Sequence, residues 1–432
     1  MNTRDVVGDP LQQIIDRHRG GAAVGITSVC SAHPLVLEAA CEQAVADSSV
    51  LLVEATSNQV DQFGGYTGMK PPDFRDLLYG IAKRTGLPRQ RLVLGGDHLG
   101  PNTWQSLPAA EAMDRAETLV AAYVAAGFTK IHLDCSMACA DDQTPLSDEV
   151  VAQRAARLAR VAEAAANQTA GPGRLCYVIG TEVPVPGGAH QVIEALTPTT
   201  PQAARTTIEA HRQAFAAAGV GQAWERVIAL VVQPGVEFDA VAVTDYDRTQ
   251  SAALSQVAEE QGLVFEAHST DYQTTAALTA LVQDHWAVLK VGPGLTFALR
   301  EALFALAAIE SELVAADQRS NLPTVVDQVM CAQPRWWAGY YSGDEAAQRV
   351  ARQYSYSDRL RYYWPEPSIA AALDRLLANL RQTPIPLPLL SAHLPEQYSR
   401  VRAGALTFDP VALAKDRVRD VLRAYSAACN PG

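Results

Sequence analysis

The sequence predicts an α/β fold, a closed (β/α)₈ barrel, followed by a C-terminal extension that is helical and rich in aromatic residues. Eight short, nearly all-apolar runs follow one another up to residue 291, as expected for parallel strands buried on both faces. Segments rich in Ala, Leu, Glu and Arg, with helical periodicity, lie between them. No glycine fingerprint follows the first run, which disfavours a doubly wound sheet, the alternative α/β architecture.

The predicted strands are rich in β-branched and aliphatic residues, and they cover residues 23–29, 50–55, 92–96, 130–134, 175–181, 227–233, 264–268 and 288–291. Helices are predicted over residues 108–127, 150–165, 203–218, 251–262 and 274–284. Pro108 suits the first turn of its helix, and Gly127 suits the position after its end. We therefore assign residues 1–315 to the barrel.

The alternation of strands and helices stops near residue 310, so we assign residues 316–432 to a mainly helical extension packed on the barrel. It ends in a helix predicted over residues 410–427. Aromatic residues cluster at 334–341 and 354–364. Because large rings dominate buried contacts, we interpret them as core or subunit interface in preference to a ligand cage, and we expect a homo-oligomer.

The composition excludes several classes of partner. The net charge is −12 without a Lys/Arg cluster, so nucleic acid is not expected. No apolar run is long enough to span a bilayer, so no membrane association is expected. The seven cysteines are odd in number and form no C-x-x-C pair, which indicates reduced thiols and a cytoplasmic protein.

Polar residues stand where the predicted strands end, and the carboxyl ends of barrel strands build the active site in this architecture. We expect a sugar or sugar-phosphate pocket there, because packing alone does not require polar groups at every strand end. The predicted site residues are Ser28, Glu54, Asn58, Asp97, His98, Asp134, Glu182, Gln233, His268 and Lys290.

His98, Glu182 and His268 are the predicted ligands of a divalent metal, for which zinc is our expectation. Asp97, Asp134 and Glu182 are the predicted catalytic carboxylates. The alternative is that each histidine is simply satisfied by hydrogen bonds. His132 is expected to be buried within its strand. The remaining histidines on helices and loops are expected at the surface: His18, His190, His211, His285 and His393.

The loops after the last two strands predict a phosphate site, since barrels commonly bind phosphate there with backbone N–H groups and a helix N-terminus. The predicted phosphate-binding residues are Ser269, Asp271, Lys290, Gly292 and Gly294. The alternative is a plain tight turn before a helix. The glycine-rich segment 64–68 is either a loop that covers the substrate or an irregular connection.

Several long strings resemble one family, the tagatose-bisphosphate aldolase class II accessory subunits of the GatZ/KbaZ type. They include SVCSAHPLV, EATSNQVDQFGGYTGM, GGDHLGPN, EAHSTDYQT and SDRLRYYWP, and the resemblance extends from about residue 14 to residue 425. It implies a non-catalytic subunit that stabilises a separate, metal-dependent class II aldolase. Some members are labelled tagatose-6-phosphate kinases, and others are ketose 4-epimerases. The sequence contains no Walker loop, so we reject the kinase label.

Class II aldolases themselves resemble this chain at Asp97-His98, an acid/base and metal-ligand pair, and at His268. They differ at the sixth strand, where a metal-binding histidine is expected and this chain has Gln233. Two hypotheses stay open. The chain is either a ketose-phosphate-binding partner of a catalytic aldolase subunit, or itself a metal-dependent lyase or 4-epimerase of ketoses or ketose phosphates that uses retro-aldol chemistry.

Overall fold

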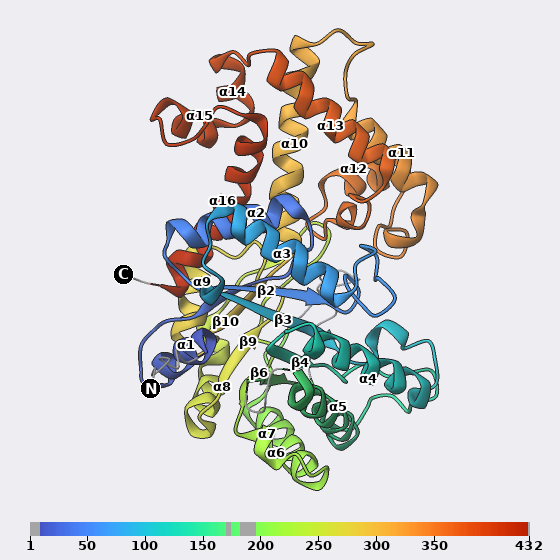
Figure 1. The fold of residues 1–432 in the computed structure, drawn as a ribbon, viewed down its shortest axis with the longest axis vertical. Coiled ribbons are helices and arrows are strands. Elements are labelled where there is room, and N and C mark those ends of the chain that lie inside the picture. The colour runs from blue at the N-terminus through green and yellow to red at the C-terminus, as the bar shows by residue number, and fades with distance from the viewer. Residues whose placement is uncertain (1–8, 170–173, 182–195, 431–432) are drawn as a thin grey trace.

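Eight parallel strands close into a barrel in the computed structural model, which describes residues 9–169, 174–181 and 196–430 (Figure 1). The order around the barrel is β1-β10-β9-β6-β5-β4-β3-β2. The strands are β1 Ile26–Val29, β2 Leu51–Thr56, β3 Leu92–Leu99, β4 Lys130–Leu133, β5 Cys176–Ile179, β6 Val227–Val231, β9 Val264–Ala267 and β10 Val288–Val291. The predicted TIM barrel is confirmed, and each barrel strand overlaps a predicted one.

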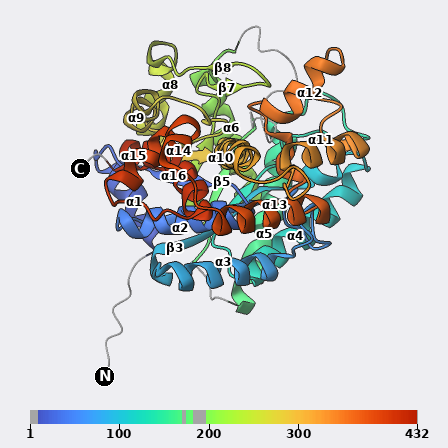
Figure 2. The ribbon, with the colours of Figure 1, turned by 90° about the horizontal axis from the view of Figure 1, so that it is seen from above.

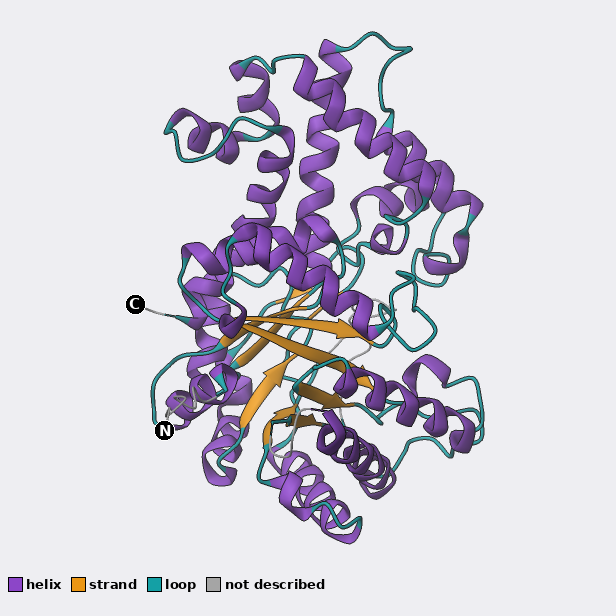
Figure 3. Cartoon of the chain, in the orientation of Figure 1, coloured by secondary structure: helices purple, strands orange, loops and turns teal. Residues whose placement is uncertain are grey.

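Helices surround the strands, which form the centre of the lower half of the molecule in Figure 3. Several begin with proline, whose fixed φ fits a first helical turn. Those before β10 are α1 Pro10–Arg19, α2 Pro34–Ala46, α3 Pro71–Thr85, α4 Ala109–Ala125, α5 Asp148–Thr169, α6 Pro201–Ala217, α7 Gly221–Trp224, α8 Arg248–Gln261 and α9 Thr275–Gln283. Short 3₁₀ turns are η1 Arg89–Arg91 and η2 Pro101–Trp104. A small antiparallel pair that we did not predict, β7 Glu237–Phe238 and β8 Val243–Thr244, follows β6.

The C-terminal region rises above the barrel, with α10 as its link (Figures 1 and 2). Its elements are α10 Pro293–Leu313, α11 Leu322–Ala332, η3 Pro334–Trp336, α12 Glu345–Tyr354, η4 Arg359–Tyr362, α13 Pro367–Gln382, α14 Leu387–His393, α15 Pro395–Arg402 and α16 Pro410–Cys429. Helix α16 returns to pack against α2, α9 and α10. There the hydroxyl of Tyr425 donates to the carbonyl of Thr270 at 2.7 Å. The boundary near residue 315 stays a prediction.

The bottom of the barrel interior is apolar and closed. Leu11 and Ile15 of α1 pack there on inward-facing residues of the strands, among them Leu52, Val178 and Val288. The polar side chains lie above this layer, toward the carboxyl ends of the strands. The apolar layer therefore closes the barrel from below and leaves one open rim.

Two expectations about histidines are wrong. His18 and His211 are buried, because each ring finds a backbone acceptor: Nδ1 of His18 lies 2.7 Å from the carbonyl of Val24, and Nδ1 of His211 lies 2.8 Å from that of Thr207. His393 is exposed, as expected, and His190 lies outside the described residues. All seven cysteines are free thiols. None of the described helices has the length and apolar character needed to cross a membrane.

Candidate active site

A buried ion network lies at the level where the barrel interior changes from apolar to polar. Nζ of Lys130 lies 2.6 Å from Oε1 of Glu54 and 2.6 Å from Oε2 of Glu266, and all three side chains are fully buried. Burial opposes the charge on Lys130, but the two carboxylates outweigh it and raise its pKa. Charged groups are tolerated in this interior because each one is paired.

Glycine at position 95 makes room for this network. A Cβ at Gly95 would lie 2.7 Å from Cγ of Glu54, closer than real Cβ contacts allow. The residues are paired across β2 and β3, so the Glu54 side chain crosses the backbone of its neighbour. The glycine at position 95 is thus explained by close packing next to the site.

Above the network, Asp97 joins strands β3, β4 and β10. Its Oδ1 lies 2.8 Å from Nδ1 of His132 and 2.5 Å from Nζ of Lys290. Burial would raise the pKa of Asp97, but the charges of His98 and Lys290 outweigh it and hold that pKa well below its usual range. Asp97 is therefore an ionised carboxylate that anchors its neighbours, and a weak base.

His98 is held in an uncommon backbone conformation, with φ of +49°. Its Nδ1 lies 2.7 Å from Oδ2 of Asp134, which in turn accepts hydrogen bonds at Oδ1 from Ser136. Burial opposes protonation of the ring, but Asp97 and Asp134 outweigh it and raise the pKa of His98. Asp134 thus fixes the ring with Nε2 available for proton transfer.

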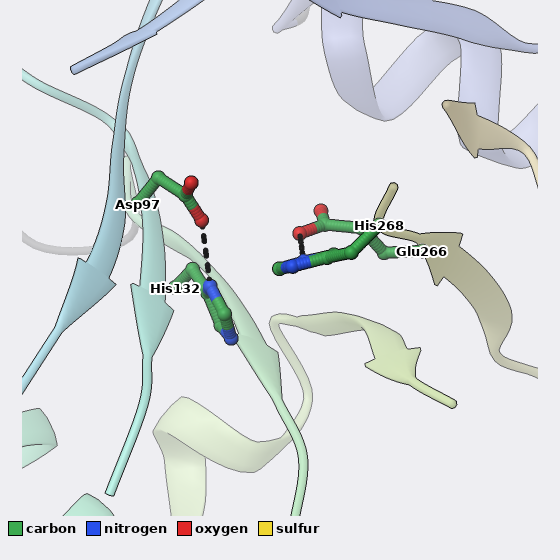
Figure 4. Close-up of side chains that lie close together, drawn as sticks. All are labelled: Asp97, His132, Glu266 and His268. Carbon is green, nitrogen blue, oxygen red and sulfur yellow. Dashed lines mark hydrogen bonds and ion pairs between the residues drawn. The ribbon is translucent and has the colours of Figure 1, made fainter. Parts of the chain in front are cut away.

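Four side chains could hold a metal ion: Asp97, His132, Glu266 and His268 each offer a ligand atom, and these atoms all lie within 4.8 Å of one another (Figure 4). They come from opposite sides of the barrel and face one another across a gap. Nε2 of His268 lies 3.0 Å from Oε1 of Glu266. Burial lowers the pKa of His268 to about 3, so the ring is a neutral ligand.

His132 provides the test of whether a metal fits. Its Nε2 is buried and has no hydrogen-bond partner within the described part of the chain. Its Nδ1 lies 2.8 Å from Oδ1 of the ionised Asp97 and 3.3 Å from the backbone nitrogen of His98. The carboxylate is the nearer and stronger partner, so in the neutral ring Nδ1 carries the proton and Nε2 a free lone pair. A carboxylate behind a histidine is the usual support of a metal-bound imidazole. The donor set therefore fits a divalent ion.

A pocket with an empty volume of about 610 Å³ opens over these groups. Asp97, His98, His268 and Lys290 line it from the barrel, and Arg361 and Tyr362 line it from the C-terminal region. The C-terminal region thus contributes directly to the pocket.

The loop that we predicted to bind phosphate is already occupied by a carboxylate. Oδ1 of Asp271 accepts hydrogen bonds from the backbone N–H of Gly292 at 2.9 Å and of Gly294 at 2.7 Å. Burial raises the pKa of Asp271 to about 6, in spite of these two donors. The N-terminus of α10 therefore has an internal anion in the place where a phosphate would bind.

Seven predicted site residues line the pocket besides Asp97: Asn58, His98, His268, Ser269, Asp271, Lys290 and Gly292. The others lie outside its lining: Ser28, Glu54, Asp134, Gln233 and Gly294. Gln233 turns to its own loop, where its Oε1 accepts from Gly235 and Val236. Ser28 donates to Glu54 at 2.6 Å below the pocket. Glu182 lies outside the described residues.

Sequence reasoning missed Lys130, His132 and Glu266 as members of the site, and Arg361 with Tyr362 as its wall. His132 is buried as expected, but it faces the polar centre. A signal was present: Lys130, His132 and Asp134 alternate with apolar residues, as do Glu266 and His268. Such period-two alternation places one set on the inner face of a strand. No comparable local signal marks Arg361.

The fold and the position of the pocket show which class of protein this chain belongs to. A closed parallel barrel with polar groups and a pocket at the carboxyl ends of its strands is a (β/α)₈-barrel protein with its site at the usual rim. Within that class, the chain belongs to the family described as D-tagatose-1,6-bisphosphate aldolase subunit GatZ/KbaZ-like, whose model matches residues 11–430. The resemblance carried by the sequence strings is thereby confirmed.

Among solved structures, the chain is similar to a probable tagatose 6 phosphate kinase from Sinorhizobium meliloti 1021. The two are 50% identical with a TM-score of 0.86, over 94% of this chain and 100% of that chain. Similarity is lower to a putative fructose-1,6-biphosphate aldolase from Coccidioides immitis, at 13% identity and a TM-score of 0.45 over 87% and 98% of the two chains. The Sinorhizobium meliloti structure matches barrel and C-terminal region together.

Proposed function

We propose that this chain is a metal-dependent enzyme that acts on a ketose or ketose phosphate by aldol-type chemistry. The observation that carries the proposal is the convergence of His98, Lys290, Asp97 and His268 at one pocket, with the ligand atoms of buried His132 and Glu266 within 4.8 Å of those of Asp97 and His268. A proton-transfer group, a fixed cation and a metal ligand set are the groups that such chemistry requires. Membership in an aldolase-subunit family supports the same reaction class.

We propose that the ion, zinc in our expectation, is held by His132 and His268 with Asp97 and Glu266. This set replaces the His98, Glu182 and His268 set that the sequence suggested. When bound, the ion would polarise the ketose carbonyl. The connected network contains four carboxylates, from Glu54, Asp97, Asp134 and Glu266, and two ammonium groups, from Lys130 and Lys290. The formal excess is two negative charges while His98 is neutral and one when His98 is protonated. That excess supports a divalent cation.

His98 is the proposed acid/base. It would accept the proton of the C4 hydroxyl as the C3–C4 bond opens, while Asp134 keeps its ring in place. The ammonium of Lys290, fixed by Asp97, would stabilise negative charge on a substrate oxygen. Asn58 and Ser269 line the pocket and would bind hydroxyl groups. A catalytic role for Glu182 stays a prediction.

Two outcomes share these groups. Release of the two fragments is aldol cleavage of a ketose bisphosphate. Rotation of the aldehyde before the C3–C4 bond re-forms gives the C4 epimer. The kinase title of the Sinorhizobium meliloti relative does not agree with this site, because the sequence has no Walker loop.

The family is described as an aldolase subunit, and this description favours a second candidate function: the chain would be a non-catalytic partner of a separate catalytic aldolase subunit. The test is to incubate the zinc-loaded chain alone with fructose 6-phosphate, tagatose 6-phosphate and both 1,6-bisphosphates, and to follow products by NMR. We expect turnover that is lost in His98→Ala. Absence of turnover, together with activation of an added aldolase subunit, would establish the second candidate instead.

A further inference from the structure

We propose that Arg361, which the C-terminal region supplies, binds the anionic group of the substrate, a phosphate monoester. The inference rests on the proposed function and names the phosphate subsite within it. Arg361 lies in η4, on the wall of the pocket whose floor carries His98 and Lys290. A ligand with its hydroxyls on the floor would present its far end to this wall.

Arg361 forms no ion pair with a carboxylate among the described residues. Its Nη1 donates to the backbone carbonyls of Ser357 and Asp358, and its Nη2 donates to the Tyr362 hydroxyl at 2.9 Å. Over the ranges that the structure describes, no carboxylate oxygen lies within 4.0 Å of its guanidinium, whereas buried Arg300 pairs with Asp358 at 2.8 Å. A cation that lines a pocket without a counter-ion is a site for an anionic ligand.

A second guanidinium strengthens the positive potential. Arg359 is 3% exposed, and its guanidinium carbon lies 3.6 Å from the Tyr340 ring centroid and 4.5 Å from that of Tyr362. No ion pair to Arg359 exists among the described residues either. Burial would raise the pKa of Tyr362, but Arg361 and Arg359 outweigh it and lower that pKa, which reflects the positive field at this wall.

The donors of the predicted phosphate loop and the Lys290 ammonium already contact carboxylates. Asp271 occupies the backbone N–H groups of Gly292 and Gly294, and Lys290 is ion-paired with Asp97. A phosphate at the α10 N-terminus would have to displace Asp271, the carboxylate that the chain itself places there. The guanidinium of Arg361 therefore differs from the Lys290 ammonium: among the described residues it has no ion pair, and it keeps N–H groups for a phosphate.

Aromatic rings fix Arg361 in place. The guanidinium carbon lies 4.5 Å from the Tyr362 ring centroid, and Tyr362 stacks on Trp336 at 4.8 Å. Tyr66, from the glycine-rich segment after β2, contacts Tyr362 with ring centroids 4.7 Å apart. The wall thus joins the C-terminal region to a barrel loop, and the phosphate subsite depends on both.

The experiment is isothermal titration of the zinc-loaded full chain with D-tagatose 6-phosphate and, separately, with D-tagatose. The variants are Arg361→Gln, Arg361→Lys and, as a matched control on an exposed arginine of α12, Arg349→Gln. We expect Arg361→Gln to weaken binding of the phosphorylated sugar by at least about 30-fold, the effect of removing one partner of a desolvated charge pair. Binding of D-tagatose should change by less than about twofold, because no phosphate is involved.

Arg361→Lys should recover part of the affinity and keeps the test valid if the glutamine variant folds poorly, which circular dichroism would reveal. If Arg361→Gln binds D-tagatose 6-phosphate as the wild type does, the phosphate assignment is wrong and the proposed function stands. If Arg361→Gln loses both ligands equally, the assignment is also wrong, because the arginine then does not select the phosphate. If the wild type binds neither sugar, both proposals fail.

Discussion

Nδ1 of His132 lies 2.8 Å from Oδ1 of Asp97, and this contact turns Nε2 of His132, which has no hydrogen-bond partner in the described part of the chain, toward the centre of the barrel. The two residues come from adjacent strands, β4 and β3. Asp97 therefore supports the His132 ring, and its other oxygen, Oδ2, lies 3.6 Å from Nε2 of His98. The division of roles between His132 and His98 follows from this contact and can be measured.

His132→Ala should lower the zinc content of the purified protein, because it removes an imidazole whose Nε2 has no hydrogen-bond partner among the described residues. His98→Ala should retain zinc and lose turnover, since Asp134 holds His98 as the acid/base. Zinc per chain, measured by plasma emission spectrometry after dialysis, distinguishes them. Loss of zinc in His98→Ala with retention in His132→Ala would favour the ligand set that the sequence suggested.

Lys130→Met should destabilise the fold strongly. It leaves the Glu54 and Glu266 carboxylates without the buried ammonium that contacts both, and breaking a buried pair costs about 3–5 kcal/mol. Urea denaturation gives the free energy of unfolding. The exposed Lys83→Met is the matched control, for which we expect a change below about 0.5 kcal/mol. Equal stability of the two variants would show that the network contributes little.

Gly95→Ala should reduce both stability and turnover. The new methyl group would meet Cγ of Glu54 at 2.7 Å and force that side chain away from Lys130. Overpacking of this kind costs about 1–3 kcal/mol. Gly339→Ala is the control, since no atom lies within 4 Å of its added Cβ and its φ is ordinary. Wild-type thermal stability in Gly95→Ala would mean that Glu54 moves without cost.

Stability should fall as pH rises from about 4.5 to about 7 because of Glu237. Burial, with the charges of Asp271 and Asp239, raises its pKa from the ordinary 4.5 to about 7. Between these values the folded protein keeps a proton that the unfolded chain has lost, so each pH unit lowers the free energy of unfolding by up to about 1.4 kcal/mol. Above about pH 7 the contribution of Glu237 to the free energy of unfolding no longer changes with pH.

Glu237→Gln removes this titration while its amide oxygen can still accept from the Phe238 N–H. The midpoint of thermal unfolding, measured for both proteins from pH 5 to pH 8, provides the test. We expect the unfolding midpoint of the variant to rise relative to that of the wild type as pH increases to about 7. Above pH 7 the difference between the two midpoints should stay constant. A difference that does not change with pH would show that Glu237 does not titrate in this range.

The sequence by itself determined the barrel. Strands such as β6 and β10 are short apolar runs because parallel strands are buried on both faces, and that requirement is local and visible in composition. It also identified Asp97, His98, His268 and Lys290, because a polar residue at the end of an apolar run stands out. The family resemblance, confirmed over residues 11–430, rests on strings of the same kind.

Only the tertiary structure decided which of these residues meet. His132 and Glu266 face each other across the barrel because closure and strand register bring β4 and β9 to one centre, and neither is encoded locally. The same holds for Asp271, whose hydrogen bonds to Gly292 and Gly294 depend on how two loops pack. Arg361 reaches the pocket because α10 leaves the barrel and the chain folds back, a long-range contact that no spacing in the sequence reveals.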